Sequence, residues 1–205
     1  YVTDFGIKKL RSLFRLISKM APNNEIVVND YGVLNIISGF ALKPVLGRLL
    51  AKQKKSPEIL KLDNNNEMIF DYASESLAHN PLNISFFKKF NIQRYDIDNT
   101  FQKIKPFSED FKHNSSEVKP KVSLYFPYIY ISTTRRCKIS SFDSIHYRLQ
   151  ISSRHDCKME CNHFLAEMSH PNFPKKIILK GNTIFGYNNS LNDIEKTGID
   201  RTVEI

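Results

Sequence analysis

The chain has 205 residues, of which 41% are hydrophobic, and a formal net charge of +9. This composition supports a sizeable core and favours one domain over residues 1–205. No run of about 18 apolar residues is present and the first ten residues lack a signal-peptide core, so the sequence excludes a membrane span and favours a cytoplasmic protein.

The first half of the chain alternates helical and strand patterns. Apolar residues at helical spacing predict an amphipathic helix over 5–20, and the β-branched run 25–29 predicts a buried strand. A helix is expected over 33–37, with Asp30 before it as a possible N-cap. The apolar run 44–50 precedes a basic tract of lysines, and 61–69 is Asn-rich and predicted to be a loop.

The second half continues this alternation. The predicted elements are a short helix over 84–90, strands over 92–97 and 122–131, an exposed loop over 105–120, and a hairpin from 176–179 and 181–187. Pro127 argues for an edge or bent strand within 122–131. Strands alternating with helices indicate an α/β fold with a parallel sheet.

Polar residues follow several of the predicted strands. Asp30, Asp96 and Asp98 lie at or near strand ends, where α/β proteins often place site residues. Asp30 with Asn29 is the most notable pair, although a helix N-cap is the favoured explanation of Asp30. His79, His113, His146 and His170 lie in polar stretches and are expected at the surface.

All three cysteines, Cys137, Cys157 and Cys161, lie in the segment 132–165. An odd, clustered set favours metal or redox chemistry over a disulfide scaffold. The spacing is compatible with three ligands of a [4Fe–4S] cluster, or with a Cys3His zinc site completed by His155 or His163. Arg135, Arg136 and Arg154 lie beside the cysteines, where positive charge stabilises thiolates. The simplest alternative is free buried thiols.

Several separated motifs resemble the collagenase-like peptidase family 32, whose catalytic type is unassigned. The Asn-Asp-Tyr-Gly segment lies within 27–34, and the run Val-Leu-Gly-Arg-Leu-Leu spans 45–50. A strand leads to the first clustered cysteine over 126–137, and Leu-Lys-Gly-Asn-Thr-Ile-Phe spans 179–185. The resemblance is spread over residues 25 to 203 and is nearest to the iron–sulfur proteins of oxygen-independent ubiquinone hydroxylation.

The resemblance implies a TIM-barrel-like α/β fold, of which this chain is expected to be an incomplete, C-terminal part. It implies a [4Fe–4S] cluster bound by Cys137, Cys157 and Cys161, with a fourth ligand upstream of Tyr1. Asn29, Asp30 and Arg48 are the implied candidates at the barrel mouth. A second family member is a possible heterodimer partner.

Three functions follow as hypotheses. The first is an oxygen-independent hydroxylation of a quinone or of RNA, and the net charge of +9 is compatible with an RNA partner. The second is a collagenase-like peptidase acting on proteins, although the family's protease motif, a Glu followed by His-Gly, is not visible in this sequence. The third is a non-catalytic module with a structural zinc site.

Overall fold

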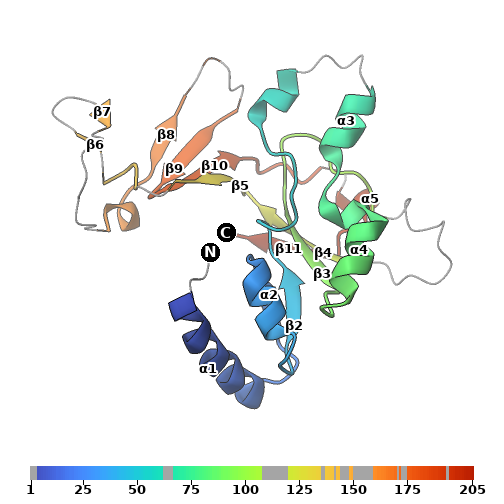
Figure 1. The fold of residues 1–205 in the computed structure, drawn as a ribbon. Helices are drawn as coiled ribbons and strands as arrows, with labels where there is room; N and C mark the ends of the chain where they lie inside the picture. The colour runs from blue at the N-terminus through green and yellow to red at the C-terminus, as the bar shows by residue number, and fades with distance from the viewer. Residues whose placement is uncertain are drawn as a thin grey trace.

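The computed structural model describes residues 4–61, 67–107, 120–134, 137–140, 142–143, 148–149, 159–169, 171, 175–192 and 194–205. These residues form a five-stranded parallel sheet, a four-stranded antiparallel sheet and a two-stranded ribbon (Figure 1). The helices are α1 (Asp4–Met20), α2 (Tyr31–Ile37), α3 (Glu67–Ser74), α4 (Pro81–Lys88) and α5 (Ile194–Thr197), with short 3-10 helices η1 (Pro57–Lys61), η2 (Leu77–His79) and η4 (Glu160–Asn162).

The parallel sheet has the strand order β1-β2-β3-β4-β11. Its strands are β1 (Glu25–Val28), β2 (Lys43–Leu46), β3 (Arg94–Asp98), β4 (Lys121–Phe126) and β11 (Arg201–Glu204). Because all five run in the same direction, their carboxyl ends lie along one edge. The sheet confirms the predicted α/β class. Within the described residues it is open, with β1 and β11 at its two edges.

Helices cover one face of this sheet because alternate strand residues point toward them. Tyr95 and Ile97 of β3 are buried in one core with Phe87 of α4, and Tyr95 packs edge-to-face on Phe87 at 6.3 Å. Phe14 of α1 and Leu34 of α2 belong to the same core. Each such side chain contributes about 1.5–3 kcal/mol through burial. No helix of the described residues is long and apolar enough to cross a membrane.

The other face of the sheet carries charges. Arg94 donates from Nε to Glu25 at 3.0 Å, from Nη2 to Asp200 at 2.8 Å, and from Nη1 to Ser123 at 3.2 Å. Burial alone raises the pKa of Asp200, but hydrogen bonds from Arg94 and the Val122 amide outweigh it and hold that pKa below its usual value. Burial also raises the pKa of Glu25, but hydrogen bonds donated by Arg201 and Arg94 outweigh it, so this pKa too lies below its usual value. Arg94 therefore links β1, β3, β4 and the residue before β11.

The antiparallel sheet has the order β5-β10-β9-β8. Its strands are β5 (Tyr128–Thr133), β8 (Ala166–Met168), β9 (Ile177–Lys180) and β10 (Thr183–Tyr187); β6 (Phe142–Asp143) and β7 (Arg148–Leu149) form the ribbon. Tyr128 packs edge-to-face on Phe185 at 6.1 Å and on Tyr187 at 5.7 Å. The aromatic residues of β5 therefore contribute to strand packing, and β9 and β10 confirm the predicted hairpin.

The prediction of one strand over 122–131 was wrong. The segment is two strands, β4 and β5, which belong to different sheets and meet at Pro127. Proline has no N–H to donate to a strand ladder, so the pairing changes there. Since β5 begins where β4 ends, the antiparallel sheet lies at the carboxyl edge of the parallel one (Figure 1).

Two further expectations were wrong. The segment 61–69 is not all loop, because α3 begins at Glu67. His79 is 5% exposed rather than at the surface, and stacks on the fully buried Phe107 at 4.1 Å. His79 Nδ1 accepts from the Ser76 amide and Nε2 lies 2.8 Å from the Lys105 carbonyl, so the neutral ring with a proton on Nε2 fits both contacts. Phe107 also contradicts a wholly exposed loop over 105–120.

Candidate functional site

A cavity of about 690 Å³ opens at the carboxyl edge of the parallel sheet. It is lined by residues that follow β1 and β2 and by residues at the end of β5: Asn29, Asp30, Tyr31, Leu49, Leu50, Lys52, Tyr130, Thr133 and Thr134. Ligands of open α/β sheets bind at this edge. The structure therefore places the predicted candidates Asn29 and Asp30 in a cavity at the expected end of the sheet.

Asn29 holds the loop after β2 in place. Its Oδ1 accepts a hydrogen bond from the Leu49 amide at 3.0 Å. The side chain occupies the space beside Gly47, where an added Cβ would lie 2.3 Å from Asn29 Oδ1. Glycine at position 47 therefore permits the contact that joins the ends of β1 and β2.

We expect Gly47→Ala to destabilise the protein by about 1–3 kcal/mol, because the new methyl group displaces Asn29 and breaks its bond to Leu49. Gly39→Ala is the matched control, since its Cβ would meet only the Ile36 carbonyl, at an ordinary 3.7 Å. Urea unfolding of both variants measures the difference. Equal midpoints for the two variants would contradict this explanation of Gly47.

Asp30 is the N-cap of α2. Its Oδ1 accepts from the Val33 amide at 3.1 Å, and its backbone is extended, with φ −143° and ψ 132°. A side chain in this role stabilises a helix by about 1 kcal/mol. The prediction that Asp30 is a helix N-cap is confirmed. Asp30 also lines the cavity.

Asp98, the last residue of β3, is the centre of a buried ionic cluster. Its Oδ1 accepts from Arg48 Nη1 at 2.7 Å and from the Tyr130 amide at 3.2 Å, and its Oδ2 accepts from Lys55 Nζ. Gln53 Nε2 donates to the Asp98 carbonyl, and Gln53 Oε1 accepts from the Asp98 backbone amide. The third predicted candidate, Arg48, is therefore positioned by a strand-end aspartate.

Two cations share this single carboxylate. The exposed fractions of the side chains are 0% for Asp98, 10% for Lys55 and 20% for Arg48. Burial lowers the pKa of Lys55, while Asp98 acts against that shift and Arg48 adds to it. A formal excess of one positive charge in a place with little water is suited to binding an anionic oxygen.

Arg48 also joins the cluster to the two sheets. Its guanidinium lies over the Tyr125 ring, 4.5 Å from the centroid, and its Nη1 donates to the Tyr128 carbonyl at 3.2 Å. Asp96 lies two residues before Asp98 on β3. Its Oδ2 is buried with no hydrogen-bond partner among the described residues, and burial raises its pKa against the influence of Tyr125 and Ser123.

The turn between β9 and β10 contacts Cys161 and is bonded to Thr134, three residues before Cys137. Thr134 donates from its amide to the Asn182 carbonyl at 2.9 Å, and Asn182 Nδ2 donates to the Thr134 carbonyl at 2.9 Å. Cys137 follows Thr134 by three residues. Cys161 packs on the same turn, its Sγ 3.4 Å from the place that a Cβ on Gly181 would take.

Neither described cysteine is in a disulfide, and both are half-buried. Cys137 Sγ accepts a hydrogen bond from the Ser140 amide at 3.4 Å. Hydrogen bonds from amides to cysteine sulfur tune the clusters that those sulfurs bind. The donor type and the local hydrogen bonding thus fit a soft metal ligand.

The remaining predicted ligands are only partly placed. Cys157 and His155 lie outside the described residues, as do Arg135, Arg136 and Arg154. His163 is exposed and caps η4, two residues after Cys161. Within the described part of the chain, no group of three His, Cys, Asp or Glu side chains is placed to hold a metal ion.

Lys55 and Asp98 were not nominated from the sequence as site residues. Asp98 was noted as a strand-end aspartate, and Lys55 only as part of a basic tract. They are 43 residues apart, so no local pattern joins them. The sequence did contain two signs of this cluster: Asp98 at the end of a predicted strand, and the lysine-rich tract that includes Lys55.

No protein-family model, curated protein or solved structure matches this chain. The function is therefore inferred from the fold and from the two parts of the site, the cavity at the carboxyl edge and the cysteine turn.

Proposed function

We propose that this protein binds an iron–sulfur cluster and acts in, or supports, an oxygen-independent hydroxylation. Two observations support the proposal: Cys161 packs on Gly181, and Thr134, three residues before Cys137, bonds to Asn182 of the same turn. Cys137, Cys157 and Cys161 would hold the cluster, which would supply one-electron redox chemistry. A reducing compartment such as the cytoplasm, where cysteines stay available for metal binding, belongs to the same proposal.

The cavity at the carboxyl edge supports a substrate site near the cysteine turn. Thr133 and Thr134 line the cavity, and Thr134 is tied to Asn182 of that turn. Asn29 positions the loop that carries Arg48, and Asp98 holds the Tyr130 amide. Tyr130 lines the cavity, whose polar residues would orient an oxygen-bearing substrate group. Quinones and RNA both carry such groups, and a net charge of +9 is compatible with RNA.

The parallel sheet is compatible with part of a TIM-barrel-like fold of the peptidase-32 type. Its helices lie on one face, and the opposite face carries charged residues, from Arg94 at the amino end of β3 to Asp98 at its carboxyl end, where barrel active sites lie. A fourth cluster ligand besides the three cysteines, and a second family member as a partner, belong to the same proposal.

Zinc is the alternative occupant of the cysteine turn. His163 lies in the same segment as Cys161, so a Cys3His site would make the protein a non-catalytic module. A zinc content near one per chain that survives exposure to air would favour that function. A peptidase would instead cleave protein substrates after all three cysteines are replaced.

Cys137→Ser and Cys161→Ser are expected to lose most of the iron and sulfide that the complete gene product binds when purified without oxygen. Serine removes the soft sulfur ligand with almost no change in volume. Iron and acid-labile sulfide assays measure the loss, and far-UV circular dichroism checks that the variants fold.

Ser140→Ala is the matched control. It removes a hydroxyl that bonds to the Cys137 carbonyl and keeps the amide that donates to Cys137 Sγ. Its iron content should equal that of the wild type. If both cysteine variants retain full iron, these two residues are not cluster ligands and the proposal fails.

A further inference from the structure

Helix α1 presents a stripe of apolar side chains to solvent. The exposed fractions are 48% for Leu13, 54% for Leu16 and 76% for Met20. Residues three and four positions apart share a helix face, so these three side chains form one stripe. Figure 1 shows α1 at the outside of the molecule, beside α2. We call this set of three residues the outer stripe.

The outer stripe is distinct from the face that α1 packs on the protein. The core-facing side chains of α1 are Ile7, Leu10, Phe14 and Ile17. At about 3.6 residues per turn, the outer stripe lies about a third of a turn away from them. A surface helix of a globular protein usually carries one apolar stripe, directed at the core. A second, exposed stripe indicates a contact with a further surface.

The helix face next to the outer stripe is basic. It carries four exposed cations: Lys8, Arg11, Arg15 and Lys19. Asp4, at the start of α1, is the single acidic residue of the helix. Among the described residues, none of the four cations is in an ion pair.

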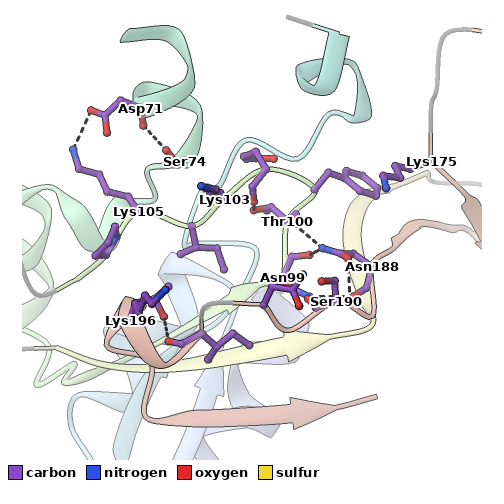
Figure 2. Close-up of a pocket in the computed structure, with 17 residues that line it drawn as sticks. Asp71, Ser74, Asn99, Thr100, Lys103, Lys105, Lys175, Asn188, Ser190 and Lys196 are labelled. Carbon is purple, nitrogen blue, oxygen red and sulfur yellow. Dashed lines mark hydrogen bonds and ion pairs between the residues drawn. The ribbon is translucent and has the colours of Figure 1, made fainter. Parts of the chain in front are cut away.

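Basic side chains elsewhere in the structure lie against carboxylates. In the cavity drawn in Figure 2, Lys105 bonds to Asp71 at 3.1 Å, and it also bonds to Glu75 at 3.0 Å. On the parallel sheet, Arg94 bonds to Glu25 at 3.0 Å. The positive charge on α1 lacks such neutralisation by the described carboxylates, so this helix is complementary to an anionic surface.

The chemistry of the outer stripe fits a lipid surface better than a protein partner. Protein interfaces depend on Trp, Tyr and Arg anchors, among which leucine is under-represented, and on directed hydrogen bonds. Leu13, Leu16 and Met20 are flexible side chains that carry no hydrogen-bond donor. A helix that lies on a membrane instead needs apolar side chains beside long cationic ones, whose charged ends reach the headgroups.

We propose that α1 docks this protein on an anionic lipid surface. The helix lies in the plane of the surface, with the outer stripe among the acyl chains next to the headgroups and the basic face against the anionic headgroups. The contact uses no residue of the cysteine turn and none that lines the cavity at Asn29. Its test therefore does not depend on a bound cluster.

Co-sedimentation of the full chain with sucrose-loaded vesicles tests the proposal. One set of vesicles is phosphatidylcholine alone, and in the other phosphatidylserine makes up about a third of the lipid. Binding to the anionic vesicles should be about tenfold or more tighter than binding to the neutral ones, because only the former attract the cations. High salt should weaken it, since salt screens exposed charges.

The double variant Leu13→Gln, Leu16→Gln should weaken binding to the anionic vesicles about tenfold or more, because it removes apolar surface from the contact. Both side chains are about half exposed and glutamine is a good helix former, so the fold should survive. Met68→Gln, Leu82→Gln is the matched control. These side chains are 82% and 81% exposed on α3 and α4, and this variant should bind as the wild type does.

The double variant Arg15→Gln, Lys19→Gln tests the basic face. It should weaken binding to the anionic vesicles about tenfold to thirtyfold, since each cation near such a surface contributes about a factor of five. Lys103→Gln, Lys121→Gln is the control with the same charge change at exposed positions outside α1, and it should bind as the wild type does.

Three results would overturn the proposal: no binding of the wild type to anionic vesicles, equal binding to neutral ones, or wild-type binding by Leu13→Gln, Leu16→Gln. Gel filtration adds a fourth, because a dimer that this variant converts to a monomer would mean that a second copy covers the outer stripe. Single-stranded RNA is the competing polyanion. RNA binding that depends on Arg15 and Lys19, without vesicle binding, would assign the basic face to RNA and would also overturn the proposal.

Discussion

Asp98→Ala is expected to destabilise the protein by about 3–5 kcal/mol, because it leaves two buried cations without their counter-charge. Asp98 is 0% exposed, and its carboxylate is the shared partner of Arg48 and Lys55. For a chain of this size the loss corresponds to a fall in Tm of about 6–20 °C. Thermal unfolding followed by circular dichroism measures it.

Asp71→Ala is the matched control for Asp98→Ala. Asp71 also pairs with a lysine, Lys105, but its side chain is 60% exposed. Ion pairs in that setting contribute about 0–1 kcal/mol, so its Tm should hardly change. Similar losses for the two variants would mean that burial does not set the strength of the Asp98 cluster.

Arg94→Ala is expected to destabilise the protein by about 2–4 kcal/mol, since each hydrogen bond to a charged group contributes about 1.5–3 kcal/mol and water replaces part of that loss. Arg94 is 6% exposed and bonds to three side chains on different strands or strand ends. Arg201→Ala is the control, because Arg201 is 46% exposed and reaches only Glu25, at 2.7 Å, among the described ion pairs. Urea unfolding should show a clearly larger loss of stability for Arg94→Ala than for Arg201→Ala.

The effect of Arg94 should also depend on pH. The pKa values of Asp200 and Glu25 lie below their usual values of 3.8 and 4.5 in the folded protein. The stability that these two carboxylates contribute is therefore present at pH values above their usual pKa values. It is lost as the pH falls through the lowered pKa values. The stability difference between wild type and Arg94→Ala should narrow below about pH 4. A constant difference from about pH 7 to about pH 3 would contradict the assigned ion pairs.

Local patterns predicted the elements whose signals are short-range. The helix over 5–20 follows from its apolar spacing, and α1 begins at Asp4 and ends at Met20. The position of Asp30 directly before a helical run predicted that it is the N-cap of α2. β11 had no such signal, because it is a short, polar strand at the edge of the sheet, with most of its residues exposed.

Contacts between distant residues could not be predicted in this way. Pro127 signals a break, but which sheet each half joins depends on β3, β11 and β10, which are far away in sequence. The bonds between Thr134 and Asn182 span 48 residues, and the Asp98 cluster joins four residues from three segments. Residue types in the site were visible in the sequence, and tertiary packing decided which of them meet.

An iron–sulfur cluster held by the cysteine turn is the feature on which the proposed function depends. Iron and acid-labile sulfide in the complete gene product, purified without oxygen, test it most directly. We predict about four iron atoms and four sulfide ions per chain, with a brown colour that air removes. A colourless protein that holds no iron even after reconstitution, or that holds one air-stable zinc ion, would contradict the proposal.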